Sequence, residues 1–275
     1  MPRTTLVALG LALILSTSAS AQSEPELTGN LPGKFSINAG VLLGADVDTK
    51  LRLDSKQGGL GTTIDLESLL GLKSSAQSFA GGITWRPHRR HQLSLSYYGL
   101  KRSNSKAIDR SITVGDSTYA VGVKFTAKFN TTYATLGYRW SPLLTSRVSA
   151  GLSVVIPVLF ASTGLTAEGA STQADVTRKE DVTVPIPLPG IFATFRLGRQ
   201  FWLDTRAQYL KVTIFGITAD NWDYGAALQY YPISHLGIAA GVAGNNIAVS
   251  GDGDRLKGKF SYDVLGATLG LTYVP

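Results

Sequence analysis

The chain has 275 residues, of which 44% are hydrophobic, 16% are charged and none is Cys, and its formal net charge is +7. The low charged fraction excludes a disordered chain and a charged helical rod, and the lack of Cys excludes disulfides, Cys-ligated zinc and a thiol nucleophile. Gly is abundant, with 30 residues. Because Gly is unfavourable inside helices, the composition favours an all-β chain.

The first residues predict export from the cytoplasm. Arg3 is followed by the apolar run Leu6–Leu15 and then by small residues that end at Ala21. This order is typical of a cleavable secretory signal, and the run is too short to span a bilayer as a helix. We expect cleavage near Ala21; the alternative is a short buried N-terminal helix.

Apolar residues alternate with small or polar residues through most of the chain. Between Val148 and Phe160 one face is wholly apolar, while the other starts small and polar and then becomes apolar. Successive side chains of a strand face opposite sides, so this pattern predicts strands with one face in an apolar environment. The same alternation runs through 119–129, 200–210, 222–230 and 264–273.

The second face of these strands distinguishes two architectures. In a soluble sandwich that face meets water and carries abundant charge, whereas in a transmembrane barrel it lines the interior with small, polar and a few charged residues. Here it is mostly Gly, Ser, Thr and Ala, and the strands reach the length of about 9–11 residues that crosses a bilayer. We therefore predict an all-β fold, a closed antiparallel up-and-down transmembrane β-barrel. The predicted segments are a signal peptide over 1–21, a periplasmic N-terminal lead-in over 22–33 and the barrel over 34–275.

Aromatic residues lie beside the short turns that we predict at 86–90, 141–146, 198–200 and 232–235. If the barrel starts and ends on the side of these turns, the aromatic residues share one level, as Trp and Tyr do at a membrane interface. The alternative, that aromatic residues merely favour strands, does not predict such clustering. The predicted girdle consists of Phe35, Trp85, Trp140, Phe201, Tyr230 and Tyr273.

The number of strands depends on two segments. If 34–54 and 118–141 are each one bent strand, the barrel has ten strands; if Ile108–Val114 is a separate short strand, it has about twelve. The alternation also changes phase near Asn130–Thr132, which we interpret as a bulge or a turn. Twelve is the favoured number and ten the alternative.

Several short segments carry a family resemblance. They are Asp65-Leu66-Glu67 with Leu70-Gly71-Leu72, then Trp85-Arg86, His91-Gln92-Leu93 and Tyr97-Tyr98. Together with the alternating strands and the exported N-terminus, they resemble the outer-membrane β-barrel proteins of Gram-negative bacteria, and are similar to a group of such barrels with no assigned activity. Val274 and Pro275 displace the usual terminal aromatic residue. The resemblance implies insertion by the barrel-assembly machinery, with periplasmic chaperones as transient partners.

Charged residues on the face opposite the lipid are the candidate site. One interpretation is a positive vestibule that favours anionic solutes. The other is that the arginines pair with carboxylates and fill a narrow interior, since small barrels are commonly closed by their own side chains. The basic candidates are Arg86, Lys124, Lys128, Arg139, Arg147, Arg196 and Arg206, and the acidic candidates are Asp204 and Asp223.

Other motifs are better explained as turns. His88-Arg89-Arg90-His91 has no accompanying carboxylate, and Asp252-Gly253-Asp254 lacks the ligand set of a calcium loop. No Ser, His and carboxylate arrangement suits a lipid-modifying enzyme, and the basic residues form no single stripe that would suit nucleic acid. We therefore expect no catalytic residue, metal, cofactor or nucleic-acid partner.

These observations predict a non-enzymatic integral protein of the Gram-negative outer membrane. The leading hypothesis is binding or passage of a small anionic solute through a basic lumen. The alternative is a structural or adhesive barrel that acts through its extracellular loops, and a lipid-modifying enzyme is the least favoured. Its expected partners are outer-membrane lipid and the assembly factors; the oligomeric state is left open.

Overall fold

The computed structural model describes residues 33–54, 61–72, 75–114, 117–168, 187–252 and 257–275. The predicted signal peptide and nearly all of the predicted lead-in lie outside these ranges. In the part that is described, no helix has the length and apolarity needed to cross a membrane.

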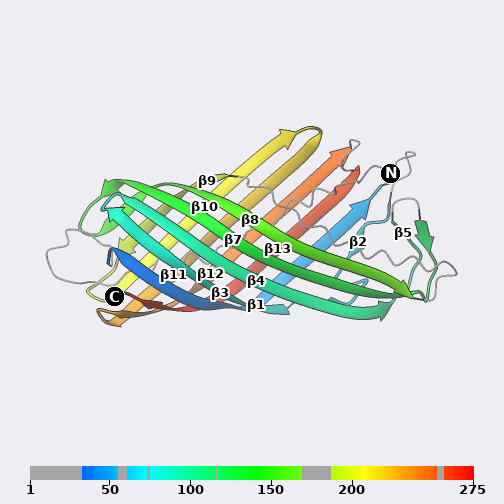
Figure 1. Ribbon diagram of the computed structural model, residues 1–275, viewed down its shortest axis with the longest axis horizontal. Coiled ribbons are helices and arrows are strands. Elements are labelled where there is room, and N and C mark those ends of the chain that lie inside the picture. Colours follow the sequence, from blue (N-terminus) through cyan, green and yellow to red (C-terminus); the bar gives the residue numbers. More distant parts are fainter. Residues whose placement is uncertain (1–32, 55–60, 73–74, 115–116, 169–186, 253–256) are drawn as a thin grey trace.

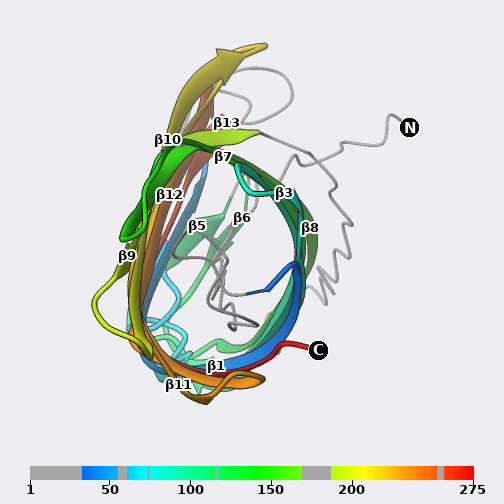
Figure 2. The same cartoon turned by 90° about the vertical axis from the view of Figure 1, so that its left-hand side faces the viewer.

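Ten long antiparallel strands form a closed barrel (Figures 1 and 2). Each strand pairs with the next barrel strand along the chain, and the last pairs with the first, which confirms the predicted up-and-down topology. The ten strands are β1 (Phe35–Leu53), β3 (Ser75–His88), β4 (His91–Ala107), β7 (Lys124–Leu144), β8 (Val148–Glu168), β9 (Leu188–Arg196), β10 (Phe201–Ile214), β11 (Ile217–Ile233), β12 (Leu236–Asp252) and β13 (Lys257–Tyr273).

The barrel therefore has the alternative number of strands, ten, and not twelve. Both β1 and β7 are single continuous strands, and β1 bends at a register shift near Leu43. The segment around Ile112 does form a strand, β5 (Ile112–Val114), but it pairs only with β6 (Ser117–Tyr119) and stays out of the barrel wall. A further short strand, β2 (Ile64–Asp65), pairs with the end of β1.

The lower part of the barrel, on the side of the short turns, presents its apolar side chains outward. Along β12, Leu236, Ile238 and Val242 are exposed on the outer face, while the inner face holds small residues and the buried Asn245. This is the arrangement that lipid requires. Similar exposed side chains on the other strands include Ile37, Ile83, Leu95, Leu136, Leu152, Leu265, Leu269 and Leu271.

The polarity of the two faces reverses further along the same strands. On β12, Ile247 and Val249 are buried inside, and Asn246 is exposed outside. The inner face of β8 likewise changes from the buried Ser149 and Ser153 to the buried Val155. The strands are longer than a bilayer crossing needs, so their far ends stand in water and follow the soluble rule of an apolar interior.

This reversal corrects the interpretation of the phase change in β7. The pairing of β4 with β7 is continuous from His91–Trp140 to Ala107–Lys124, so there is no bulge or turn near Asn130. Leu136 is exposed outside, whereas Phe125, an odd number of residues away, is buried inside. The apolar residues change face because β7 leaves the membrane, and the strand itself keeps its register.

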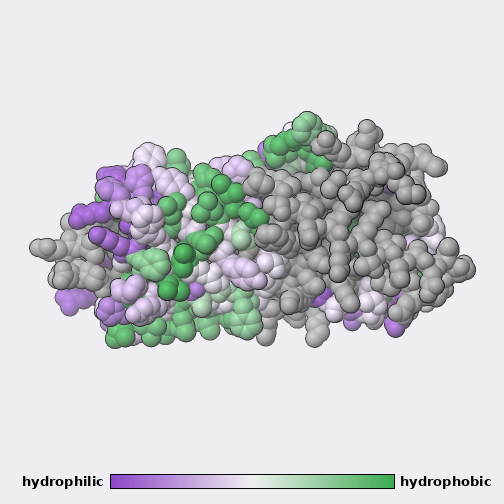
Figure 3. Space-filling model, in the orientation of Figure 1, coloured by the Kyte–Doolittle hydropathy of each residue, from purple (hydrophilic) through white to green (hydrophobic). Residues whose placement is uncertain are grey.

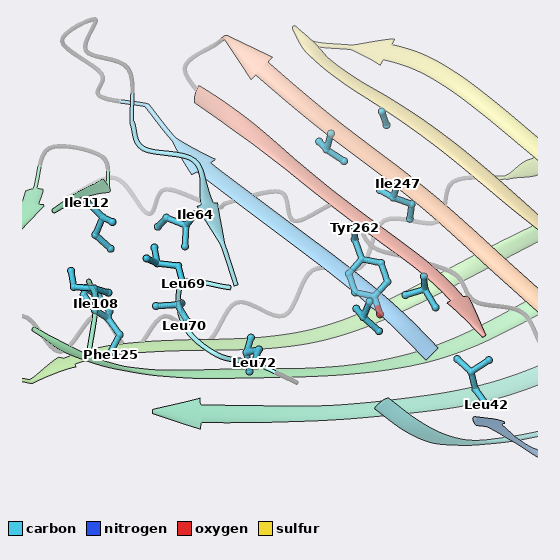
Figure 4. Packing of buried hydrophobic residues seen from close by; sticks show 14 of the residues in the cluster. Leu42, Ile64, Leu69, Leu70, Leu72, Ile108, Ile112, Phe125, Ile247 and Tyr262 are labelled. Atoms are coloured by element: carbon cyan, nitrogen blue, oxygen red, sulfur yellow. The ribbon is translucent and has the colours of Figure 1, made fainter. Parts of the chain in front are cut away.

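An apolar core fills the half of the barrel that lies away from the short turns (Figure 4). We call this half the extracellular half, because barrels of this kind have short periplasmic turns and longer extracellular loops. The segment 61–72 supplies Leu69, Leu70 and Leu72, all buried, and packs against wall residues such as Tyr262. Backbone and side-chain bonds between Thr62 and Thr113 tie this segment to the β5–β6 hairpin. The barrel therefore has two interiors, one polar at membrane level and one apolar above it.

Candidate functional site

Aromatic residues frame the membrane-level part of the barrel. Phe201 stacks on its cross-strand partner Tyr230 with ring centroids 4.8 Å apart, and Tyr209 packs on Trp222 at 4.6 Å. The two pairs lie eight residues apart on β10, or about 26 Å along the strand. Counted inclusively, the two levels bound nine residues of β10, which matches the roughly 9–11 residues of a tilted strand that crosses a bilayer.

The predicted girdle lies on the outer surface at the level of the short turns. Phe35 is the cross-strand partner of Trp85, Trp140 is the partner of His91, and Tyr273 is the partner of Ile37. All six predicted aromatic residues are at least 36% exposed. Trp and Tyr rings at such positions meet lipid on one side and headgroups on the other.

An ion pair crosses the interior inside this frame. The guanidinium of Arg139 on β7 donates to both carboxylate oxygens of Asp204 on β10, at 2.9 and 3.2 Å. Thr194 on β9 donates its hydroxyl to the same carboxylate at 2.8 Å, and the guanidinium also lies 4.6 Å from the ring centre of Phe192. Arg139 and Asp204 are only 7% and 4% exposed.

A second pair joins neighbouring strands. Arg206 donates its Nε hydrogen to Asp223 at 2.9 Å, and Asp223 is fully buried. Near the short turns, Arg86 donates to the side chain of Gln92 at 3.1 Å and to the carbonyl of Gly33 at 3.0 Å. Side chains that are so little exposed do not line a water-filled channel. Within each of the two ion pairs, Arg139–Asp204 and Arg206–Asp223, the charges neutralise each other in the interior.

The remaining candidate residues divide into three groups. Arg196 shares the inward face of β9 with Thr194, and its guanidinium lies over the Trp202 ring at 5.8 Å. Two predictions were wrong: Lys124 is exposed on the outer side of the extracellular half, because β7 has reversed its faces there, and Arg147 is exposed in the turn before β8. The side chain of Lys128 lies outside the described residues.

A small polar cavity lies beside the Arg139 pair. It is lined by the hydroxyl-bearing Ser94, Thr135 and Ser153, by Arg139 and by Gln208, whose amide oxygen is buried without a hydrogen-bond partner. Its volume is about 10 Å³, which is room for one water molecule and for nothing larger. The cavity therefore suits an internal water that bridges these groups.

An ion pair that could not be predicted from the sequence anchors the inward segment 61–72. Glu67 forms an ion pair with Arg102 on β4 and accepts the backbone N–H of Thr49 at 2.7 Å, and Arg102 also donates to the Thr49 hydroxyl at 2.8 Å. The two charged residues are 35 positions apart. No local spacing in the sequence signals such a pair.

Three carboxylates lie close together where segment 61–72 meets β1. One ligand atom from each of Asp48, Asp65 and Glu67 lies within 4.8 Å of the others. Lys50 forms an ion pair with Asp48, and Arg102 forms one with Glu67. These cations already balance part of the acidic charge, so the group can be explained without a metal ion.

The three His residues lie at the other end of the barrel. His88 and His91 flank the β3–β4 turn, and His91 is 2.7 Å from the Tyr138 hydroxyl. His235 lies in the β11–β12 turn, where its Nδ1 is 2.8 Å from the carbonyl of Val274. Each imidazole is explained by a contact within its own turn or with a neighbouring strand.

One extracellular hairpin tip is exposed and strained. Phe215 and Gly216 form the two-residue turn between β10 and β11, with φ values of 50° and 77°. Such turns favour Asn, Asp or Gly, and a bulky residue at positive φ is uncommon. Phe215 is nevertheless 80% exposed, and Ile214 beside it is 52% exposed. Apolar residues gather over this tip in Figure 3.

A closed up-and-down barrel, an outward apolar belt and two aromatic levels define the class: this is an outer-membrane β-barrel. No protein-family model matches the chain, and no curated protein matches it. Among solved structures, it is similar to the outer membrane protease OmpT from Escherichia coli. The identity is 15%, the match covers 86% of this chain and 96% of that chain, and the TM-score is 0.52.

Two further structures are more remote. A Pseudomonas aeruginosa FadL homologue is 11% identical, over 88% of this chain and 91% of that chain, with a TM-score of 0.35. Neisserial surface protein A is 14% identical, over 88% of this chain and 97% of that chain, with a TM-score of 0.27. Likeness to OmpT at 15% identity extends to the fold alone.

Proposed function

We propose that the protein is a non-enzymatic outer-membrane barrel that acts through its extracellular half and does not serve as an open pore. The observation that carries this proposal is the presence of two buried salt bridges at membrane level. Arg139–Asp204 reaches from β7 to β10 through the interior, and Arg206–Asp223 joins the neighbouring strands β10 and β11. The apolar core above them adds a second closure. This reverses the order of the two leading hypotheses from the sequence.

The extracellular half offers a surface for contact with a partner. Phe215 combines positive φ with high exposure, and strained residues of this kind concentrate at functional sites. A convex aromatic tip on a two-stranded ribbon suits an apolar pocket on another molecule, where aromatic anchors contribute much of the binding energy. We therefore assign recognition or adhesion to this half of the barrel.

The absence of enzymatic activity is part of the proposal. The His residues lie at the short-turn end, away from the extracellular carboxylates, so the described residues do not place an imidazole beside them. Biogenesis through the barrel-assembly machinery and periplasmic chaperones is likewise proposed, on the strength of the outer-membrane fold. No cofactor enters the proposal.

Passage of a small anion is the second candidate. It is favoured by the excess of positive charge among the described inward-facing residues at the short-turn mouth, where Arg86, Arg139 and Arg196 accompany the carboxylate of Asp204. Such passage requires the Arg139–Asp204 pair to open. The two candidates therefore differ in whether the folded barrel conducts.

Conductance of the purified protein in planar bilayers tests the proposal. We expect no steady current from the wild-type barrel, and the same result from Phe215→Gly. Stable channels with an anion-selective reversal potential would overturn it and favour the second candidate. Cells that display wild-type barrel or Phe215→Gly are then compared for sedimentation and surface adhesion. Loss of adhesion in Phe215→Gly, with equal surface display, supports the extracellular role, and equal adhesion contradicts the role of this tip.

A further inference from the structure

Exposed cations gather at the end of the barrel that bears the short turns. They come from the start of β1, the β3–β4 turn, the β7–β8 turn and the β9–β10 turn. Figure 3 shows hydrophilic side chains over this end, beside the apolar band. We call this set the basic arc, and its members are Lys34, Arg89, Arg90, Arg147 and Arg199, all exposed.

Among the described side chains at this end of the barrel, cations outnumber carboxylates. Among the described residues at this end of the barrel, Asp204 is the nearest acidic residue, and it is buried against Arg139. The described exposed carboxylates, such as Asp46 and Asp109, lie towards the other end. The described side chains at this end therefore carry an excess of positive charge.

The aromatic girdle fixes the depth of these cations. Lys34 directly precedes Phe35, Arg89 and Arg90 follow Trp85 within five residues, and Arg199 lies two residues before Phe201. Since girdle rings mark the boundary between hydrocarbon and headgroups, the cations lie at headgroup depth. The depth and the charge of these side chains together indicate that they contact negatively charged headgroups.

We propose that the basic arc binds the phosphate groups of anionic phospholipids in the leaflet next to the short turns. Lys and Arg side chains near the membrane surface are attracted to an anionic leaflet. Arg is also suited to phosphate because its planar fork of donors matches the phosphate oxygens. The arc spans the turns from β1 to β10, and the β11–β12 turn, which holds His235, adds no Lys or Arg. This inference is independent of the proposed extracellular role.

Tryptophan quenching by acyl-brominated lipids tests the inference on the full barrel. A Trp222→Phe background removes the lipid-facing Trp of the upper level, and Trp202 is buried. Trp85 and Trp140 then report on lipid beside the basic arc. Vesicles of phosphatidylcholine with increasing phosphatidylglycerol, one of them brominated, give the ratio of the two apparent association constants.

At low salt we expect phosphatidylglycerol to be preferred by about threefold to tenfold. The variant with Lys34, Arg89, Arg90, Arg147 and Arg199 all changed to Gln is expected to bring the ratio close to one. The matched control changes five cations of the extracellular half, Lys50, Arg110, Lys124, Lys211 and Lys259, to Gln and keeps the preference. About 0.5 M NaCl, where the Debye length is a few ångströms, is expected to remove the wild-type preference.

Three outcomes would overturn the proposal. They are a wild-type ratio near one at low salt, equal losses in the arc variant and the control variant, and a preference that salt does not change. The variant of the basic arc with five substitutions is replaced by Arg89→Gln/Arg90→Gln where it fails to fold. Folding is judged by the heat-dependent shift of the barrel on a gel. A reduced ratio in this double variant supports the proposal, and an unchanged ratio contradicts it.

Discussion

Arg139 on β7 and Asp204 on β10 form an ion pair through the barrel interior, with two hydrogen bonds whose N–O distances are 2.9 and 3.2 Å. In the barrel wall, β8 and β9 lie between these two strands. Removing one partner leaves the other charge buried without compensation, which is destabilising, whereas replacing both partners with apolar residues leaves no buried charge. The pair therefore closes the interior, and its contribution to stability depends on both partners being present.

Asp204→Ala should lower the free energy of unfolding by about 3–5 kcal/mol, because Arg139 then keeps a buried charge without its carboxylate. Arg139→Met combined with Asp204→Leu should recover most of this loss. Urea titration of the barrel in detergent measures both values. Arg147→Ala is the matched control, since Arg147 is exposed; a loss as large as that of Asp204→Ala would contradict the assignment.

Leu269→Arg should destabilise the barrel by about 2–4 kcal/mol, the cost of a cation on the lipid face near the midplane. Leu269 is 46% exposed on the outer face of β13. Asn246→Arg, on the outer face beside its cross-strand partner Trp222 at the upper aromatic level, should cost less than about 1 kcal/mol. The free energy of folding into lipid vesicles is the measurement, and equal costs would show that the apolar belt is misplaced.

Because the chain has no Cys, single Cys substitutions report the orientation cleanly. A membrane-impermeant maleimide added to intact cells should label Lys124→Cys and leave Phe125→Cys unlabelled, since Lys124 is exposed and Phe125 is 1% exposed. Arg147→Cys should react only after the outer membrane is permeabilised. Labelling of Arg147→Cys in intact cells would mean that the barrel is inserted the other way round.

Leu70→Ala should loosen the inward segment 61–72, at a local cost of about 2–5 kcal/mol for a fully buried leucine. Leu70 is 0% exposed. Amide hydrogen exchange should rise in 64–72 and stay unchanged in the membrane-level part of β10. Leu136→Ala, on the lipid face of β7, serves as the control, and faster exchange of 64–72 in this control would contradict a role for the core contact.

The fold could be predicted from sequence because alternation along a strand is a local signal. The inner face of β8, which changes from Ser149 and Ser153 to Val155, also indicates that the interior becomes more apolar along the strand. The same change in β7 was interpreted as a bulge or turn near Asn130, because a reversal of environment and a slip of register give similar patterns. Pairing with β4 separates the two, and pairing is not local.

The site was less accessible to sequence reasoning. The charged residues of the interior could be proposed from strand phase, and Arg86, Arg139, Arg196, Arg206, Asp204 and Asp223 do face inward. Which partner each residue takes depends on distant strands, as Arg139 with Asp204 and Arg102 with Glu67 show. Lys124 was misplaced because phase was extended past the point where the environment reverses.

The reversal of faces has a consequence for the chain before assembly. In a newly exported chain, β7 and β8 each have one apolar face along half of the strand and the opposite face apolar along the other half. Such a strand cannot bury both apolar segments against one flat surface, and pairing with a non-native strand leaves one of the two segments exposed to water. Only the finished cylinder, with hydrocarbon around its waist and segment 61–72 inside its upper half, satisfies both segments at once.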